Sequence, residues 1–152
     1  MKRLVIVFTV MLSVLFSNAQ SFKLEHDHST IQVENIEVSA QFYSDILQLK
    51  EIATPWPKFK LIRFFETGNN QQLHIAQAQL DKYGDVKVNK VLHLAFTVRN
   101  FDRYLEFLNE NDINYSDFAG ESNNIQSRPD GVRQIYFQDP DGYWIEINDA
   151  KH

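Results

Sequence analysis

Polar and apolar residues alternate between Glu25 and Val33, which predicts a strand with one face turned to a core. Asn35 suits the N-cap of a helix, and apolar residues follow it at helical spacing. These apolar positions are Val38, Phe42, Ile46 and Leu49. We expect this face of the helix to cover the apolar face of the strand.

Two further strands are predicted after the helix, Lys60 to Glu66 and Gln71 to Ala78, with a turn at residues 68–70 between them. In the second of these strands, His74 lies on the side opposite the apolar face. Residues 79–90 are polar, lack periodicity and are expected to form a linker. The first unit is therefore predicted to be a strand, a helix and about three more strands.

The second half of the chain repeats this order. His28 to Asn35 and His93 to Asn100 share one spacing, in which the His is followed five residues later by Val and seven residues later by Asn. Such self-similarity is typical of a duplicated supersecondary unit. We therefore expect a second strand and helix here, the helix having as its apolar positions Phe101, Tyr104, Leu105 and Leu108.

The remaining strands of the second unit are predicted at Ile113 to Phe118, Val132 to Phe137 and Tyr143 to Asn148. A polar loop, residues 120–130, separates the first two. Residues 139–142, Asp-Pro-Asp-Gly, suit a tight turn between the last two. The polar face of the last strand is expected to carry Trp144, Glu146 and Asn148.

The first residues of the chain do not fit this plan. Lys2 and Arg3 precede an apolar run from Leu4 to Phe16, and residues 17–19 supply the small side chains of a cleavage site. The run is shorter than the roughly 20 residues that span a bilayer. We predict a signal peptide at 1–19, a domain at 20–152 with modules at about 24–79 and 90–149, and export to the periplasm or secretion. A buried helix or an uncleaved anchor is the alternative.

Charge and composition narrow the partners. Without residues 1–19 the chain has 13 basic and 20 acidic residues, a formal charge of −7. Such a chain, with no basic cluster, is expected to bind neither nucleic acid nor, after signal cleavage, an anionic membrane. The absence of cysteine excludes disulfides, thiolate ligands and a thiol nucleophile. Any metal must therefore be held by histidine and carboxylate.

Four ligand-type residues occupy matching places in the two units. His28 and His93 lie on the first strand of each unit, and His74 and Glu146 lie on the polar face of each last strand. If the units pack about a pseudo-twofold axis, the four side chains converge on one cleft. Three imidazoles and a carboxylate suit a divalent ion such as Zn, Ni, Co, Mn or Fe.

Taken singly, these residues have plainer explanations. A lone histidine on a polar face is an ordinary residue, and Glu146 fits exposure to solvent or a pair with Arg133. A buried carboxylate needs a partner, however, and a bound cation supplies one. Weaker candidates for contact with a substrate, each with an equally good structural explanation, are Arg133, Tyr136 and Trp144.

The chain resembles the vicinal oxygen chelate superfamily, which includes glyoxalase I, methylmalonyl-CoA epimerase, extradiol dioxygenases and the fosfomycin and bleomycin resistance proteins. The matching segments are residues 28–35, 41–43, 47–49, 93–100 and 137–147. The resemblance implies an α+β fold of two tandem βαβββ modules that form an open barrel-like cleft around a divalent metal. It also implies a homodimer, and ligand positions that fall on His28, His74, His93 and Glu146. Two residues depart from the pattern: His74 stands where glyoxalase I has a carboxylate, and Gln48 stands where the family often has Gly.

The resemblance implies a lyase or isomerase for a small substrate with two adjacent oxygens, in which the metal stabilises an enediolate and Glu146 is the base. A ligating His74 argues against a ring-cleaving dioxygenase, which needs three open positions on iron. A binding protein of the resistance type, with the fold but no catalysis, is the alternative. Export disfavours strict glyoxalase I activity, because glutathione is chiefly cytoplasmic. The substrate, the native metal, and the pairing of modules within one chain or between two are left open.

Overall fold

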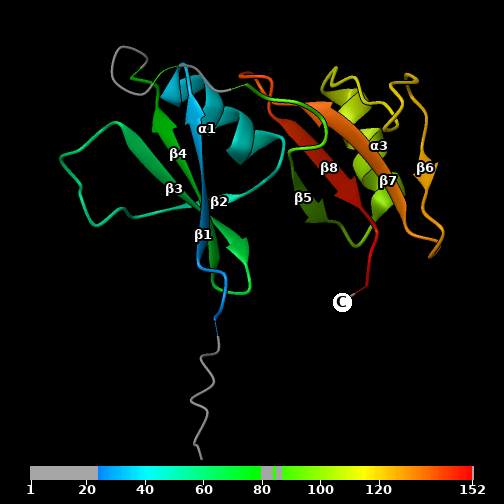
Figure 1. Ribbon diagram of the computed structural model, residues 1–152, viewed down its shortest axis with the longest axis horizontal. Helices are drawn as coiled ribbons and strands as arrows, with labels where there is room; N and C mark the ends of the chain where they lie inside the picture. The colour runs from blue at the N-terminus through cyan, green and yellow to red at the C-terminus, as the bar shows by residue number, and fades with distance from the viewer. Residues whose placement is uncertain (1–23, 80–83, 85–86, 152) are drawn as a thin grey trace, which may run out of the picture.

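The computed structural model describes residues 24–79, 84 and 87–151, which form two modules side by side (Figure 1). The first module has one helix and a four-stranded sheet in the order β1-β4-β3-β2. Its elements are β1 (His28–Val33), α1 (Ile36–Asp45), β2 (Lys50–Ile52), β3 (Ile62–Gly68) and β4 (Gln71–Gln77).

The second module repeats this arrangement in a sheet of order β5-β8-β7-β6. The first and last strands of each sheet are parallel neighbours. The predicted α+β fold of tandem βαβββ modules is confirmed, and the two sheets are not closed into one barrel. The elements are β5 (His93–Thr97), α3 (Phe101–Glu110), β6 (Gln126–Ser127), β7 (Arg133–Gln138) and β8 (Trp144–Asn148).

The strand register reproduces the repeat seen in the sequence. His28 and His93 are the first residues of β1 and β5. Two residues further on, each strand pairs with the ligand-type residue of its parallel neighbour, His74 in the first sheet and Glu146 in the second. Side chains two residues apart on a strand share a face. Each module therefore presents its two ligand-type residues on one side of its sheet.

The other side of each sheet packs with the two helices into a shared core. This core contains buried residues of both sheets and both helices. Phe42 of α1 contacts Phe137 of β7, with ring centres 6.3 Å apart. The sheet faces that carry the ligand-type residues, called the open faces below, therefore point away from the shared core. The first module contributes to this core residues such as Val33, Tyr43 and Phe65, and the second contributes residues such as Leu108, Ile135 and Ile145.

Asparagines cap both helices, as predicted. The Asn35 side chain accepts hydrogen bonds from the amides of residues 37 and 38, and Asn100 accepts one from the amide of Arg103. The buried stripe of α1 differs from the predicted one, because Val38 is 50% exposed. The residues that α1 buries are Ile36, Ser39, Ala40 and Tyr43. Ser39 can be buried in this stripe because its hydroxyl donates a hydrogen bond to Asp141 of the second module.

One predicted strand is replaced by isolated bridges. Ser116 pairs singly with Ser122 and Tyr136, and the short strand β6 lies inside the predicted loop 120–130. The cause is Asp117, whose carboxylate accepts hydrogen bonds from the amides of residues 120 and 121 at 2.8 and 2.9 Å. Local side-chain bonds of this kind compete with a ladder and favour a turn.

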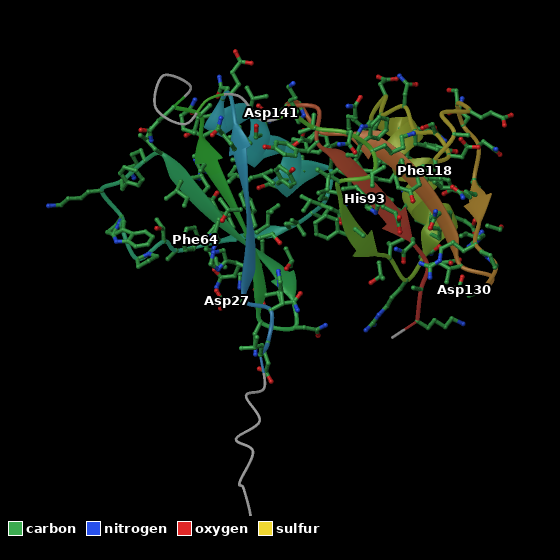
Figure 2. All side chains as sticks on the ribbon, viewed as in Figure 1. Asp27, Phe64, His93, Phe118, Asp130 and Asp141 are labelled. Atoms are coloured by element: carbon green, nitrogen blue, oxygen red, sulfur yellow. The ribbon has the colours of Figure 1, made fainter. Side chains whose placement is uncertain are left out.

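The turn between β7 and β8 ties the two modules together. The buried Asp139 accepts a hydrogen bond from the Tyr43 hydroxyl at 2.7 Å. Asp141, marked in Figure 2 where the modules meet, accepts one from the Ser39 hydroxyl at 2.6 Å and one from the amide of Glu34. Burial raises the pKa of Asp139, and the hydrogen bond from Tyr43 acts in the opposite direction.

Gln48 follows α1 with a left-handed φ of 53°. A side chain with a Cβ adopts this conformation at a cost of about 1 kcal/mol, whereas glycine adopts it without steric conflict. This backbone position explains why the resembling family often has Gly there.

The predicted signal peptide lies outside the described residues, and export remains a prediction. Within the described part of the chain, no helix combines the length and the apolar character that a membrane span requires.

The contact between the turn and α1 can be tested with Tyr43→Phe. Burial holds the pKa of Asp139 above its unfolded value, so the stability linked to this group is full at low pH and decreases as the pH rises through the folded pKa. Removing the hydroxyl raises that pKa further. We expect a loss of about 1–3 kcal/mol in the free energy of unfolding at pH 7 and a smaller loss near pH 4. Urea unfolding at both pH values, at equal protein concentration, measures it.

Tyr115→Phe is the matched control for this experiment. The Tyr115 residue is also largely buried, and its hydroxyl forms no hydrogen bond with another described residue. Its removal should change stability by less than about 0.5 kcal/mol. Equal losses in the two variants, or a Tyr43→Phe loss that does not vary with pH, would contradict the role assigned to Asp139.

Candidate metal centre

Strands β5 and β8 bring His93 and Glu146 together on the open face of the second sheet. His93 Nε2 lies 3.3 Å from Glu146 Oε2. The other ring nitrogen, Nδ1, lies 2.9 Å from the carbonyl oxygen of Lys90. A carbonyl only accepts, so Nδ1 carries the proton. In the neutral ring, Nε2 then turns a lone pair toward a carboxylate oxygen, an arrangement that needs a cation or a second proton between the two atoms.

A hydrogen-bond network fixes both oxygens of Glu146, which is 6% exposed. The Tyr136 hydroxyl donates to Oε2 at 2.5 Å, and Asn148 Nδ2 donates to Oε1 at 2.7 Å. Gln134 Nε2 in turn donates to the Tyr136 hydroxyl at 2.9 Å. Burial, and next the bond to Glu146, raise the pKa of Tyr136, so this hydroxyl remains a donor at neutral pH.

His28 has an equivalent arrangement on the first module. Its Nδ1 lies 2.5 Å from Asp27 Oδ2, and this bond lowers the pKa of Asp27. The carboxylate accepts and Nδ1 donates, which leaves Nε2 with the free lone pair. Histidines that bind metals usually donate their second ring N–H to a carboxylate or a carbonyl. His28 and His93 both have such an acceptor.

The distance between His93 and Glu146 fits a shared divalent ion. Two donors that each lie about 2.1 Å from one ion are about 3.0 to 3.4 Å apart when they subtend an angle of roughly 90° to 109°. The observed 3.3 Å lies within this range. Imidazole nitrogen with carboxylate oxygen is a donor set suited to Zn, Mn, Fe, Co or Ni. The residues present therefore fit a divalent metal.

His74 reaches His28, as the repeat predicts, but it is packed between two rings. The Phe64 and His28 ring centres lie 3.5 and 4.2 Å from that of His74, and both rings are stacked on it. Its Nε2 is bonded to Gln72 Oε1 at 2.8 Å, and burial lowers its pKa. An ion in the ring plane of His28 would meet the face of His74, where imidazole has no lone pair. The stacking suits a supporting role better than ligation.

The two ligand-type pairs do not meet within one chain. Across the described residues, no group of three or more His, Asp or Glu side chains is close enough to hold one ion. The shared core is the physical reason, because it turns the two open faces away from each other. Figure 2 shows Phe64 on the first module and His93 on the second. Within a single chain the structure therefore does not bring the four side chains together, and their role as metal ligands remains a prediction.

The three weaker candidates divide between the two faces of the second sheet. Tyr136 is paired in register with Glu146, and Trp144 lies two residues before it, so both lie on the open face. Arg133 lies on the helix side. Its guanidinium is therefore not a partner of Glu146, and it contacts Asp102, Asp149 and the ring of Phe101.

Sequence analysis did not identify Lys90, although it lies on the same open face. Its Nζ is 4.0 Å from the centre of the Trp144 ring and 5.5 Å from that of Tyr136. Burial lowers its pKa. The sequence feature that could have identified Lys90 is its place three residues before the ligand-type residue His93, in a segment that was predicted to be a linker.

A hollow of about 530 Å³ lies between the modules. Of the four ligand-type residues it includes only His93. Its lining mixes apolar side chains, among them Leu47, Leu73 and Phe96, with polar ones, among them His26, Gln72 and Thr97.

The fold and the site together define a class: α+β proteins of two βαβββ modules whose open sheet faces carry histidines and a carboxylate. A family model described as the Glyoxalase/Bleomycin resistance protein/Dioxygenase superfamily matches residues 26–147. The chain belongs to this superfamily, as its sequence motifs predicted.

The chain is similar in sequence to two bacterial proteins and in structure to a third. It is 28% identical over 128 residues to metallothiol transferase FosB from Staphylococcus saprophyticus, covering 80% of this chain and 74% of that protein. It is 31% identical over 128 residues to the uncharacterized protein YwbC from Bacillus subtilis, covering 80% and 94%. The structure of a glyoxalase family protein from Bacillus anthracis has a TM-score of 0.67 at 26% identity, covering 87% and 99%.

Tyr136→Phe tests whether the network orients Glu146 for a metal. The variant removes the donor to Oε2 and keeps the ring. We expect Zn²⁺ affinity to fall about 10- to 100-fold, the usual effect of losing a group that orients a metal ligand. Titration against a competing chelator measures this. Tyr104→Phe is the control, because its hydroxyl donates to the Ile46 carbonyl at 2.9 Å on the core side. Equal affinities for Zn²⁺ in the two variants would refute the orienting role.

Proposed function

We propose that this protein is a divalent-metal-dependent enzyme of the lyase or isomerase type, acting on a small molecule with two neighbouring oxygens. His93, Glu146 and His28 would hold the ion. The observation that carries the proposal is the 3.3 Å approach of His93 Nε2 to Glu146 Oε2, with Nδ1 already bonded to a carbonyl. Similarity to a metallothiol transferase supports the dependence on a metal.

A second copy of the chain would supply His28. In this homodimer the open face of the first module of one copy packs on the open face of the second module of the other. A twofold axis then produces two equivalent sites. Exposed aromatic residues on both faces support the pairing: Trp56 packs on Phe64 and is 57% exposed, and Phe118 packs on Tyr136 and is 44% exposed.

The residues of the site have separate tasks in this proposal. A bound ion would supply Lewis acidity to two adjacent substrate oxygens. Glu146 is the candidate acceptor for a proton from the neighbouring substrate carbon. Tyr136 and Asn148 hold its two oxygens, so the carboxylate stays in place while it acts.

Thiol transfer is a second candidate function. Two observations favour it: the similarity to FosB, and the hydrogen bonds that Tyr136 and Asn148 donate to the Glu146 oxygens, which occupy lone pairs that a proton acceptor would use. In a transfer, the sulfur of an external thiol forms a bond to a substrate carbon as a carbon–oxygen bond breaks, and the thiol proton goes to the released oxygen. NMR in D₂O with hydroxyketones and an added thiol distinguishes the two reactions. A lyase or isomerase introduces deuterium beside the substrate oxygens, whereas a transferase forms a thiol adduct without this exchange.

Mixing two inactive variants tests the shared site. His28→Ala removes a proposed metal ligand from the first module, and Glu146→Ala removes one from the second. If each site draws on two chains, a mixed dimer contains one site in which both modules are intact. Random reassortment makes about half of the dimers mixed, so metal binding should return to about a quarter of the wild-type capacity. Metal analysis after unfolding and refolding the mixture measures the recovery.

The control for this mixture is His28→Ala combined with the double variant that carries both changes. No dimer in that mixture has an intact site, so no metal capacity should return. Recovery in neither mixture, with wild-type protein refolding to full capacity, would show that each site belongs to one chain and would overturn the proposed dimer.

The number of ligands is tested with His74→Phe. This change keeps an aromatic ring between Phe64 and His28 and removes both nitrogens. We expect the Kd for Zn²⁺ to change by less than about threefold, and to rise by more than about 100-fold in His28→Ala, because only His28 has a free Nε2. Chelator competition measures both. If the two variants lose metal equally, His74 is a fourth ligand, as the family resemblance implies.

A further inference from the structure

Lys90 is a half-buried cation beside the candidate metal centre. Its Nζ donates to Ser116 Oγ at 3.2 Å and to the Asp117 carbonyl at 2.9 Å. No carboxylate of the described residues forms an ion pair with it. The Asp117 carboxylate is itself occupied by two backbone amides and the side chain of Asn124.

The paired arginines of the described chain provide a contrast. Each is bound by at least one carboxylate, as Arg63 is by Glu37 and Glu51. These ion pairs link elements or brace loops, and they use the charge of the arginine. Among the described residues, Lys90 forms no such ion pair, and Asp117 is the acidic residue that acts on its charge from further away. Keeping an ammonium partly out of water without a direct counter-charge is unfavourable.

Two aromatic rings hold the ammonium on the open face of the second sheet. Nζ lies 4.0 Å from the centre of the Trp144 ring, a cation–π contact that stabilises the charge but offers no acceptor oxygen. Trp144 is in register with His93 and precedes Glu146 by two residues on the same face. Side chains with this spacing are about 7 Å apart. The ammonium is therefore about one small molecule's length from the candidate metal ligands.

Among the described residues, one donor of this ammonium has no acceptor. A lysine has three N–H groups, and Ser116 and Asp117 accept two of them. The chain as a whole has a formal charge of −5, so its general field repels anions. An anionic substrate would need a fixed local cation, and Lys90 is one.

We propose that Lys90 binds a negatively charged oxygen group of the substrate, such as a second carboxylate, while the neighbouring oxygens of the same molecule lie at His93 and Glu146. This inference rests on the proposed function. It narrows the substrate class to small hydroxy or oxo acids with a further anionic group a few bonds from the oxygen pair. Lys90 would then determine specificity without taking part in the bond changes.

Malate and malamate test this inference on the metal-loaded protein. Both contain the same 2-hydroxy acid unit, and they differ in the distal group, a carboxylate in malate and a neutral amide in malamate. Calorimetry with wild-type protein should show malate binding about tenfold or more tighter than malamate, as a charge-assisted hydrogen bond predicts. Lys90→Met should reduce this ratio to about one, and Lys90→Arg should retain part of it.

Lys87→Met is the matched control, because it removes the same charge from an exposed residue nearby and should leave the ratio unchanged. Unchanged preference for malate in Lys90→Met overturns the inference. Equal binding of the two acids, or no binding of malate, by metal-loaded wild-type protein also overturns it and needs no folded variant. Metal analysis comes first: protein that takes up no metal refutes the proposed function itself, whereas metal uptake without a charge preference refutes only the role of Lys90.

Discussion

The hydrogen bonds from α1 to the β7–β8 turn determine how the two modules sit, and the form of the site follows from them. Tyr43 satisfies the buried carboxylate of Asp139, and Ser39 satisfies Asp141. Amides of the turn itself bond one oxygen of Asp139, and Tyr43 bonds the other. A buried carboxylate is costly without such donors, so contact with α1 stabilises the turn. Placing α1 there joins the helix sides of both sheets in one core. The open faces must then point outward, and each chain carries two separated half-sites.

The two half-sites are the His28–His74 pair and the His93–Glu146 pair. Both orient their first histidine in the same way, but with different hydrogen-bond acceptors. In each, an oxygen acceptor holds Nδ1 of the first histidine and leaves Nε2 free: the Asp27 carboxylate for His28, and the Lys90 carbonyl for His93. The second half-site is the more rigid, because backbone geometry fixes its acceptor and Glu146 is buried in a network. Asp27 is 82% exposed, so His28 is less firmly held in the free chain. We infer that His93 and Glu146 form the more rigid half of the site and that His28 completes the coordination.

Local rules predicted much of this structure. The period of two assigned the correct side chains to the open faces, and Asn35 and Asn100 cap the helices as expected. Local rules failed wherever a distant partner decides the outcome. Ser39 is buried because it reaches Asp141, 102 residues away, and the modules are oriented by Tyr43 and Asp139, 96 residues apart. Neither contact leaves a local pattern. Lys90 was missed for the same reason, since its rings come from β7 and β8.

The residues opposite His74 and Glu146 explain why equivalent places in a duplicated fold differ in chemistry. Phe64 pairs with His74 across the first sheet, and Tyr136 pairs with Glu146 across the second. Phenylalanine has no donor, so a carboxylate at position 74 would lack the hydrogen bond that Tyr136 gives to Glu146, whereas an imidazole stacks on the ring. Tyrosine supplies the missing hydroxyl, and a carboxylate beside it is held in a fixed direction. The cross-strand partner thus makes one position suited to support a neighbouring histidine and the other suited to bind a metal.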